Sequence, residues 1–174
     1  SPQSYTVSTA MTGGGSGSID LNPPGGVYSY GTVVTATANA ATGSIFSGWS
    51  GDCNGTDDCV LTVASDKSIT ATFATASYNI GAATGGAGGS VGIEPPSGPY
   101  LYGTVITATA TADPGYGFAG WTDGGVPVST SAVYTFTVTG DHALSATFAP
   151  LSYSVYTATA GSGSGSIGLN PPGG

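Results

Sequence analysis

This chain contains an internal repeat, which limits the folds that it can adopt. The motif Phe-x-Gly-Trp occurs at residues 46–49 and again at 118–121, a spacing of about 72 residues. Other short motifs return in the same order, which is typical of tandem modules and not of one continuous domain. We expect modules over residues 1–76 and 77–151, and the first third of another over 152–174. Since that last copy stops after a Pro-Pro pair, we expect the sequence to be a piece of a longer array.

Polar and apolar residues alternate along every candidate element. Around Thr35 and Thr37, for example, Val34, Ala36 and Ala38 fall on the opposite face, which is the two-residue period of a half-buried strand. No segment combines helical apolar spacing with capping residues. We therefore predict an all-β fold of about six short strands per module, with no significant helix. Six aromatic residues at matching positions are the expected core and signature of the repeats: Phe46, Trp49, Phe73, Phe118, Trp121 and Phe148.

The charge composition excludes two classes of partner. The chain has one residue of Lys or Arg in total, nine of Asp or Glu, and a net charge of −8. Nucleic-acid binding requires many basic contacts to phosphates, and adsorption on anionic lipid requires basic clusters. No apolar run reaches the roughly 18 residues that a membrane span needs. We therefore expect no nucleic-acid partner and no membrane insertion.

The two cysteines, Cys53 and Cys59, lie in a loop rich in Gly, Asp and Asn. A metal site needs further soft ligands nearby, and a redox motif needs closer spacing. We favour a local disulfide, which indicates an oxidising compartment and hence an extracellular or cell-surface location. The second unit lacks cysteines and has more aromatic residues, with Tyr134 at the position of Cys59. We expect the disulfide to stabilise one small module and extra aromatic burial to stabilise the other.

The ordered series of motifs resembles the divergent InlB B-repeat family. In the first unit it includes Tyr-Gly-Thr-Val from residue 30, Phe-Ser-Gly-Trp-Ser-Gly-Asp-Cys from residue 46 and Asp-Lys-Ser-Ile-Thr-Ala-Thr-Phe from residue 66. The resemblance covers almost the whole chain, although the second unit departs from it by lacking the cysteines. It implies tandem β-grasp-like modules of secreted or surface-anchored bacterial proteins, used as stalk, spacer or adhesive surface. A sandwich-like module is the other architecture that we consider. The family offers no catalytic residues or cofactor to transfer, so we expect no enzyme.

Few residues are candidates for chemistry. His142 falls in a turn, where a solvated side chain is a better interpretation than a catalytic base. Asp52, Asp57 and Asp58 surround the cysteine loop and could supply oxygen ligands to calcium, but their spacing does not match a known calcium loop. We favour plain surface acidity for them and predict no metal site.

Tyrosines follow both Pro-Pro turns and are the candidate contact residues. Tyr28, Tyr30, Tyr100 and Tyr102 could stack on a glycan or a neighbouring chain, and packing between consecutive modules is the alternative that we favour. From the repeats, the short linkers and the sparse charge, we expect an extracellular structural protein that forms a surface stalk or a self-assembling filament. Its partners would be neighbouring repeats and other copies of itself. The second hypothesis is an adhesin or a carbohydrate-binding accessory module, with a glycan or cell-surface ligand.

Overall fold

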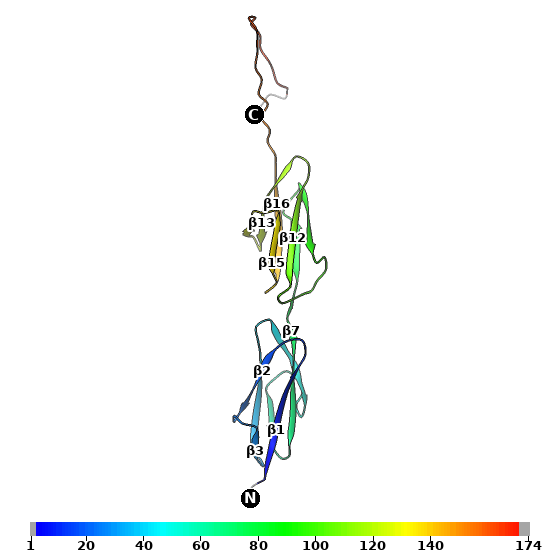
Figure 1. Cartoon of the computed structure of the whole chain (residues 1–174), viewed down its shortest axis with the longest axis vertical. Coiled ribbons are helices and arrows are strands. Elements are labelled where there is room, and N and C mark those ends of the chain that lie inside the picture. The colour runs from blue at the N-terminus through cyan, green and yellow to red at the C-terminus, as the bar shows by residue number, and fades with distance from the viewer. Residues whose placement is uncertain (1–2, 171–174) are drawn as a thin grey trace.

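The computed structural model describes residues 3–170 and shows two β modules stacked end to end along one long axis (Figure 1). Within this range every regular element is a strand, so the predicted all-β class without helix is confirmed. The same range includes no helix able to cross a bilayer. Residues 151–170 run on from the second module as an exposed segment without strands. The third Pro-Pro pair, Pro171 and Pro172, lies outside the described residues.

The first module is a sandwich of two sheets. One sheet has four strands in the order β3-β1-β7-β5 and the other has three in the order β2-β4-β6. Strands β1 and β7 run parallel, whereas all other neighbours are antiparallel. The strands are β1 (Ser4–Thr12), β2 (Gly17–Asn22), β3 (Val27–Ser29), β4 (Val33–Ala40), β5 (Ser44–Gly51), β6 (Cys59–Thr62) and β7 (Lys67–Thr75).

The second module repeats this topology with two changes. Its first strand is interrupted at Asn79, so that β8 pairs with β11 while β9 runs parallel to β16 in the sheet β14-β13-β16-β9. Strand β14 is an additional edge strand, and β10-β12-β15 form the opposite sheet. The strands are β8 (Ser77–Tyr78), β9 (Ile80–Thr84), β10 (Gly89–Glu94), β11 (Tyr100–Leu101), β12 (Val105–Ala112), β13 (Tyr116–Asp123), β14 (Val126–Ser129), β15 (Val133–Thr137) and β16 (His142–Pro150).

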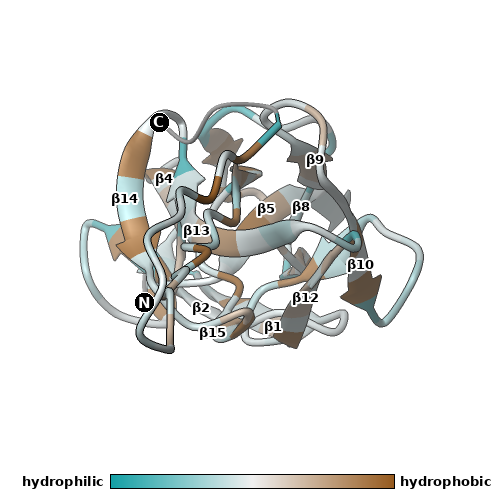
Figure 2. Ribbon diagram, turned by 90° about the horizontal axis from the view of Figure 1, so that it is seen from above, coloured by the Kyte–Doolittle hydropathy of each residue, from teal (hydrophilic) through white to brown (hydrophobic). Residues whose placement is uncertain are grey.

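Sequence alternation places the apolar side chains between the sheets. Val34 and Ala36 are fully buried in β4, whereas Val33 beside them is 54% exposed. The module 1 core is one continuous cluster, and the module 2 core divides into two clusters, around Trp121 and around Ile106. Viewed along the long axis, the strands of the two modules overlap, and strongly apolar residues of β14 lie at the periphery (Figure 2).

The Phe-x-Gly-Trp signature encodes a β-bulge. Residues three apart on a regular strand point to opposite faces, so this Phe and Trp could not both be buried. In β5 the register with β7 shifts between Phe46 and Gly48, and in β13 it shifts at the equivalent place. The extra residue brings both rings to the inner face, where Phe46 and Trp49 have ring centroids 5.2 Å apart. Trp121 and Phe73 are among the most fully buried side chains, while Phe118 and Phe148 are partly buried.

Candidate functional site

The candidate functional site is the junction between the modules, where one residue is bonded to both. Ala76 is 7% exposed and lies between β7, which ends at Thr75, and β8, which begins at Ser77. Its N–H donates to the carbonyl of Gly43 in the first module at 2.8 Å. Its carbonyl accepts from the N–H of Tyr102 in the second module, also at 2.8 Å. The modules therefore share a hydrogen-bonded residue and have no free linker between them.

The ring of Tyr102 packs on the turn that joins β4 and β5. A Cβ atom at Gly43 would overlap the ring atoms of Tyr102, so any side chain here would displace the ring. Gly43 also has a φ of +76°, which side-chain-bearing residues rarely adopt. Close approach and backbone conformation thus both require glycine, and the ring covers the turn of the preceding module.

The four candidate tyrosines divide into two pairs with different roles. Tyr28 and Tyr100 are 7% and 6% exposed, so the expectation of a glycan or partner contact needs correction for these two residues. Each hydroxyl donates at 2.7 Å to a carbonyl of its own Pro-Pro turn, at Pro23 and Pro95 respectively. They are core residues with a satisfied polar end.

The remaining two tyrosines occupy equivalent positions with different surroundings. Tyr102 packs against the first module, whereas Tyr30 is 65% exposed and leans on Tyr5 with ring centroids 6.4 Å apart. Tyr28 and Tyr100 therefore belong to the module cores, whereas Tyr30 and Tyr102 lie at the module ends.

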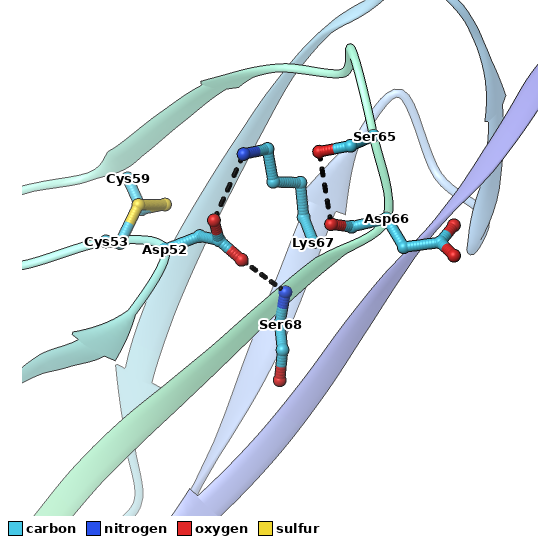
Figure 3. A network of polar contacts seen from close by, with 7 residues as sticks. All are labelled: Asp52, Cys53, Cys59, Ser65, Asp66, Lys67 and Ser68. Carbon is cyan, nitrogen blue, oxygen red and sulfur yellow. Dashed lines mark hydrogen bonds and ion pairs between the residues drawn. A yellow bond between two sulfur atoms is a disulfide. The ribbon is translucent and has the colours of Figure 1, made fainter.

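Asp52 organises a turn of the first module and is not a free surface acid (Figure 3). Its carboxylate accepts from the N–H of Ser68 at 2.7 Å and from Nζ of Lys67 at 3.0 Å. The Ser68 hydrogen bond, followed by that of Lys67, lowers the pKa of Asp52 below its ordinary value. Asp66, in the same turn, accepts at 2.8 Å from the N–H of Thr6 on β1. These carboxylates tie the start of β7 to both of its neighbouring strands.

The second module builds the same turn with a histidine in place of the lysine. Nδ1 of His142 lies 2.5 Å from Asp123, whose other oxygen accepts from the N–H of Ala143 at 2.8 Å. Burial alone would raise the pKa of Asp123, but the hydrogen bonds from His142 and Ala143 lower it overall. Asp141 accepts at 2.7 Å from the N–H of Asn79, as Asp66 does from Thr6.

His142 is not the solvated turn residue that the sequence indicated. Its side chain is 22% exposed, and its ring lies 4.7 Å from that of Phe136. Its Nε2 atom is buried without a hydrogen-bond partner among residues 3–170, so the Asp123–His142 pair faces no nucleophile there. His142 stands at the position of Lys67, and Asp123 bonds it as Asp52 bonds Lys67, which points to a structural role for the pair.

A disulfide between Cys53 and Cys59 closes the loop after β5, with Cα atoms 5.9 Å apart. The loop folds back over Trp49, whose indole N–H donates to the carbonyl of Asp57 at 2.9 Å. Asp57 thus contributes through its backbone, and Asp58 is exposed. Among the described residues, no three His, Cys, Asp or Glu side chains gather into a group that could hold a metal ion.

The second module replaces this loop with the hairpin β13–β14. Here the indole N–H of Trp121 donates to the carbonyl of Ala132 at 3.3 Å, so the tryptophan retains a backbone acceptor. An open groove of about 650 Å³ lies along the hairpin, lined by Trp121, Pro127, Val128 and Thr130 among others. Because Trp121 is 1% exposed, it offers no ring face for stacking.

Three features of the site went unnoticed in the sequence, although signals for two of them exist. Asp123-Gly-Gly-Val126 is a hairpin signal, since two central glycines suit the turn that joins twisted strands. An aspartate follows the tryptophan closely in each repeat, Asp52 three residues after Trp49 and Asp123 two residues after Trp121, which is a signal of a shared structural role. The contact of Tyr102 with Gly43 has no local signal, because the two residues belong to different modules.

Comparison with known protein families gives a match to both modules. The profile of the divergent InlB B-repeat domain family matches residues 5–77 and again residues 80–152. Comparisons with curated proteins and with solved structures found no match. The two matched segments contain every strand residue except Ser4, the first residue of β1, and Tyr78, the second residue of β8. The chain therefore belongs to the divergent InlB B-repeat family, as two consecutive domains of a tandem array.

Proposed function

We propose that this chain is a structural segment of an extracellular array, which serves as a stiff surface stalk or, where copies associate, as a filament. We assign it no catalytic role and no cofactor. The observation that carries the proposal is the junction at Ala76, which bonds to Gly43 on one side and Tyr102 on the other. A stalk needs its modules to hold a constant relative orientation, and this junction supplies the contacts for it.

The energetics of the junction favour stiffness. Bending the chain at Ala76 would break two buried backbone hydrogen bonds, each contributing roughly 0.5–1.5 kcal/mol net. It would also expose the face of Tyr102 that covers Gly43. Flexible arrays separate their modules by several unbonded residues, whereas here only Ala76 lies between β7 and β8.

The chemistry of the chain suits an extracellular setting. Disulfides are typical of oxidising compartments, so the Cys53–Cys59 bond supports this proposal. With one residue of Lys or Arg in total, the surface offers little electrostatic attraction to anionic membranes or nucleic acids.

Residual dipolar couplings test whether the modules move as one body. We expect the amides of both modules to fit a single alignment tensor. The matched control is a variant with Gly-Ser-Gly inserted between Thr75 and Ala76, which should give two different tensors. If the unmodified chain also requires two tensors, the stiff-stalk proposal is wrong.

A binding module is the second candidate, because the groove along β14 is an open, partly apolar surface. It suits a ligand that contacts Val128 and the hydroxyls of Ser129 and Thr130, such as a glycan. A glycan array comparing the unmodified chain with Thr130→Trp, which fills the groove, tests this role. Equal signals, or no signal, would contradict it.

A further inference from the structure

We propose that the second module carries a ready-made acceptor for a further repeat, and that this acceptor binds the ring of the second tyrosine in that repeat's Tyr-x-Tyr motif. The surface is the turn at Gly115 together with Leu151. This inference rests on the proposed array function and extends it by assigning the contact that would propagate the array.

The acceptor turn has the backbone of the junction already present in the chain. Leu151 donates its N–H to the carbonyl of Gly115 at 2.8 Å, as Ala76 does to Gly43. Gly115 has a φ of +85°, against +76° for Gly43. The two turns therefore have the same hydrogen bond and similar glycine conformations.

The two turns differ in what covers them. The Cβ position of Gly43 is occupied by the ring of Tyr102, whereas nothing lies within 4 Å of that position at Gly115. Leu151 is 48% exposed, while Ala76 is 7% exposed. The turn at Gly115 in the second module is therefore uncovered, whereas the equivalent turn at Gly43 in the first module is covered by Tyr102.

The opposite end of the chain carries the complementary half. Tyr30 donates its N–H to the carbonyl of Gln3 at 2.9 Å, as Tyr102 does to Ala76. Its ring is 65% exposed, whereas the ring of Tyr102 packs on Gly43. A repeat of this family therefore presents a tyrosine at one end and a glycine turn at the other.

The occupant that fits best is the next repeat of the same polypeptide. At the observed junction a single residue, Ala76, makes both backbone bonds. Leu151 already makes one of them, so Gln3 of a second copy could not take that place without displacing it. Residues 153–170 repeat the sequence pattern of β1 and β2, and such a repeat would supply its tyrosine directly. Repeating one head-to-tail contact generates an open helical rod.

A matched pair of glycine variants tests the acceptor. Gly43→Ala and Gly115→Ala impose a methyl group on similar positive-φ backbones, but only the first meets a tyrosine ring. In the chain as it is, we expect Gly43→Ala to lower the melting temperature by several degrees more than Gly115→Ala. Equal shifts would contradict the role of the ring at the junction.

The decisive comparison uses a chain lengthened by one repeat. Residues 171–174 read Pro-Pro-Gly-Gly like 23–26, so appending a copy of sequence 27–76 after Gly174 completes a third repeat. In this longer chain we expect Gly115→Ala to become as damaging as Gly43→Ala. An unchanged effect of Gly115→Ala would overturn the proposal.

A second measurement avoids the glycine substitutions and the backbone strain that they introduce. An aromatic ring over Gly43 should shift its Hα resonances upfield by ring current, and the Gly115 resonances should lack this shift. Lengthening the chain should move the Gly115 resonances upfield, and replacing the new tyrosine with alanine should reverse the change. If they move instead with the concentration of the unlengthened chain, a second copy is the occupant and the proposal is wrong. Dipolar couplings report separately on the stiffness of the Ala76 junction, so the two proposals can fail independently.

Discussion

The two modules have the same sheet order, the same bulge and the same pair of turn carboxylates, but they stabilise the region after the tryptophan differently. The first closes it with the Cys53–Cys59 disulfide, and the second extends it into the β13–β14 hairpin. The first module also has an unbroken first strand and one core cluster, whereas the second has a strand interrupted at Asn79 and a divided core.

This comparison separates what the fold requires from what it tolerates. Both modules keep a buried tryptophan whose indole N–H reaches a backbone carbonyl, at Asp57 or at Ala132. The covalent closure and the extra strand are alternative ways to hold that carbonyl in place. Extra aromatic contacts accompany the hairpin, since Tyr134 stacks on Phe136 with ring centroids 5.3 Å apart. The sequence predicted that aromatic residues stabilise the second module in place of the disulfide. It did not predict that the β13–β14 hairpin also takes part.

Truncating the matching phenylalanines should give the largest effect and expose the difference between the cores. Phe73 is 1% exposed in a continuous cluster, so Phe73→Ala should destabilise its module by about 3–5 kcal/mol. Phe148→Ala, at a partly buried position, should cost less. Denaturant unfolding followed by the single tryptophan of each module, in Trp121→Phe and Trp49→Phe backgrounds, measures the two losses. Equal losses would show that the cores are equivalent.

Removing the disulfide should affect one module only. The double variant Cys53→Ser/Cys59→Ser opens a loop of sequence separation 6, and chain entropy predicts a loss of about 2 kcal/mol in the first module. The second module, observed through Trp121, should unfold as before. A dithiothreitol titration of the unmodified chain is the control. If both modules weaken together, the junction couples their stabilities strongly.

Acid should weaken both modules through the same carboxylates. The folded pKa of Asp52 and of Asp123 is lowered, so each contributes stability above its unfolded pKa of about 3.9 and loses it as pH falls through the folded value. We expect unfolding free energies to decline below about pH 4. The loss from Asp123→Asn should stay under about 1 kcal/mol at neutral pH, because the pair is partly solvated. Removing the carboxylates should make the unfolding free energy less dependent on pH below about pH 4. If the variants keep the same pH dependence, Asp52 and Asp123 are not its cause.

A conservative change in the hairpin turn should give the smallest effect. Gly124 and Gly125 have φ values of +54° and +87°, as a type I′ turn requires, and asparagine is favoured at the first of these positions. Gly124→Asn should therefore stabilise the second module by a few tenths of a kcal/mol through the lower entropy of its unfolded chain. Gly125→Val, which strains the same turn, is the opposing control. If the Gly125→Val variant melts at a higher temperature than the Gly124→Asn variant, the conformation of this turn does not determine the stability of the hairpin.

Much of the fold could be predicted from local pattern. Alternation assigned Val34, Ala36, Ile69, Ala71 and Phe73 to the interior, where all five are buried. Strands β3, β11 and β14 were missed, because the first two have three and two residues and the third is mostly exposed. At the candidate site, the sequence indicated tyrosines near the Pro-Pro turns. It could not separate the buried Tyr28 and Tyr100 from Tyr30 and Tyr102, since the two members of each pair lie two residues apart in one short segment and share its alternation.

Short periods and direct self-similarity were enough to predict most strands, their inward faces, the two-module organisation and membership of the repeat family. The three-dimensional arrangement was needed to reveal the parallel pairing of β1 with β7, the bulge that brings Phe46 beside Trp49, and the packing of Tyr102 on Gly43. Alternation specifies which face of a strand is buried, but not which strand lies beside it. That choice depends on hydrogen bonds between residues some sixty positions apart, such as the bond from Thr6 to Asp66.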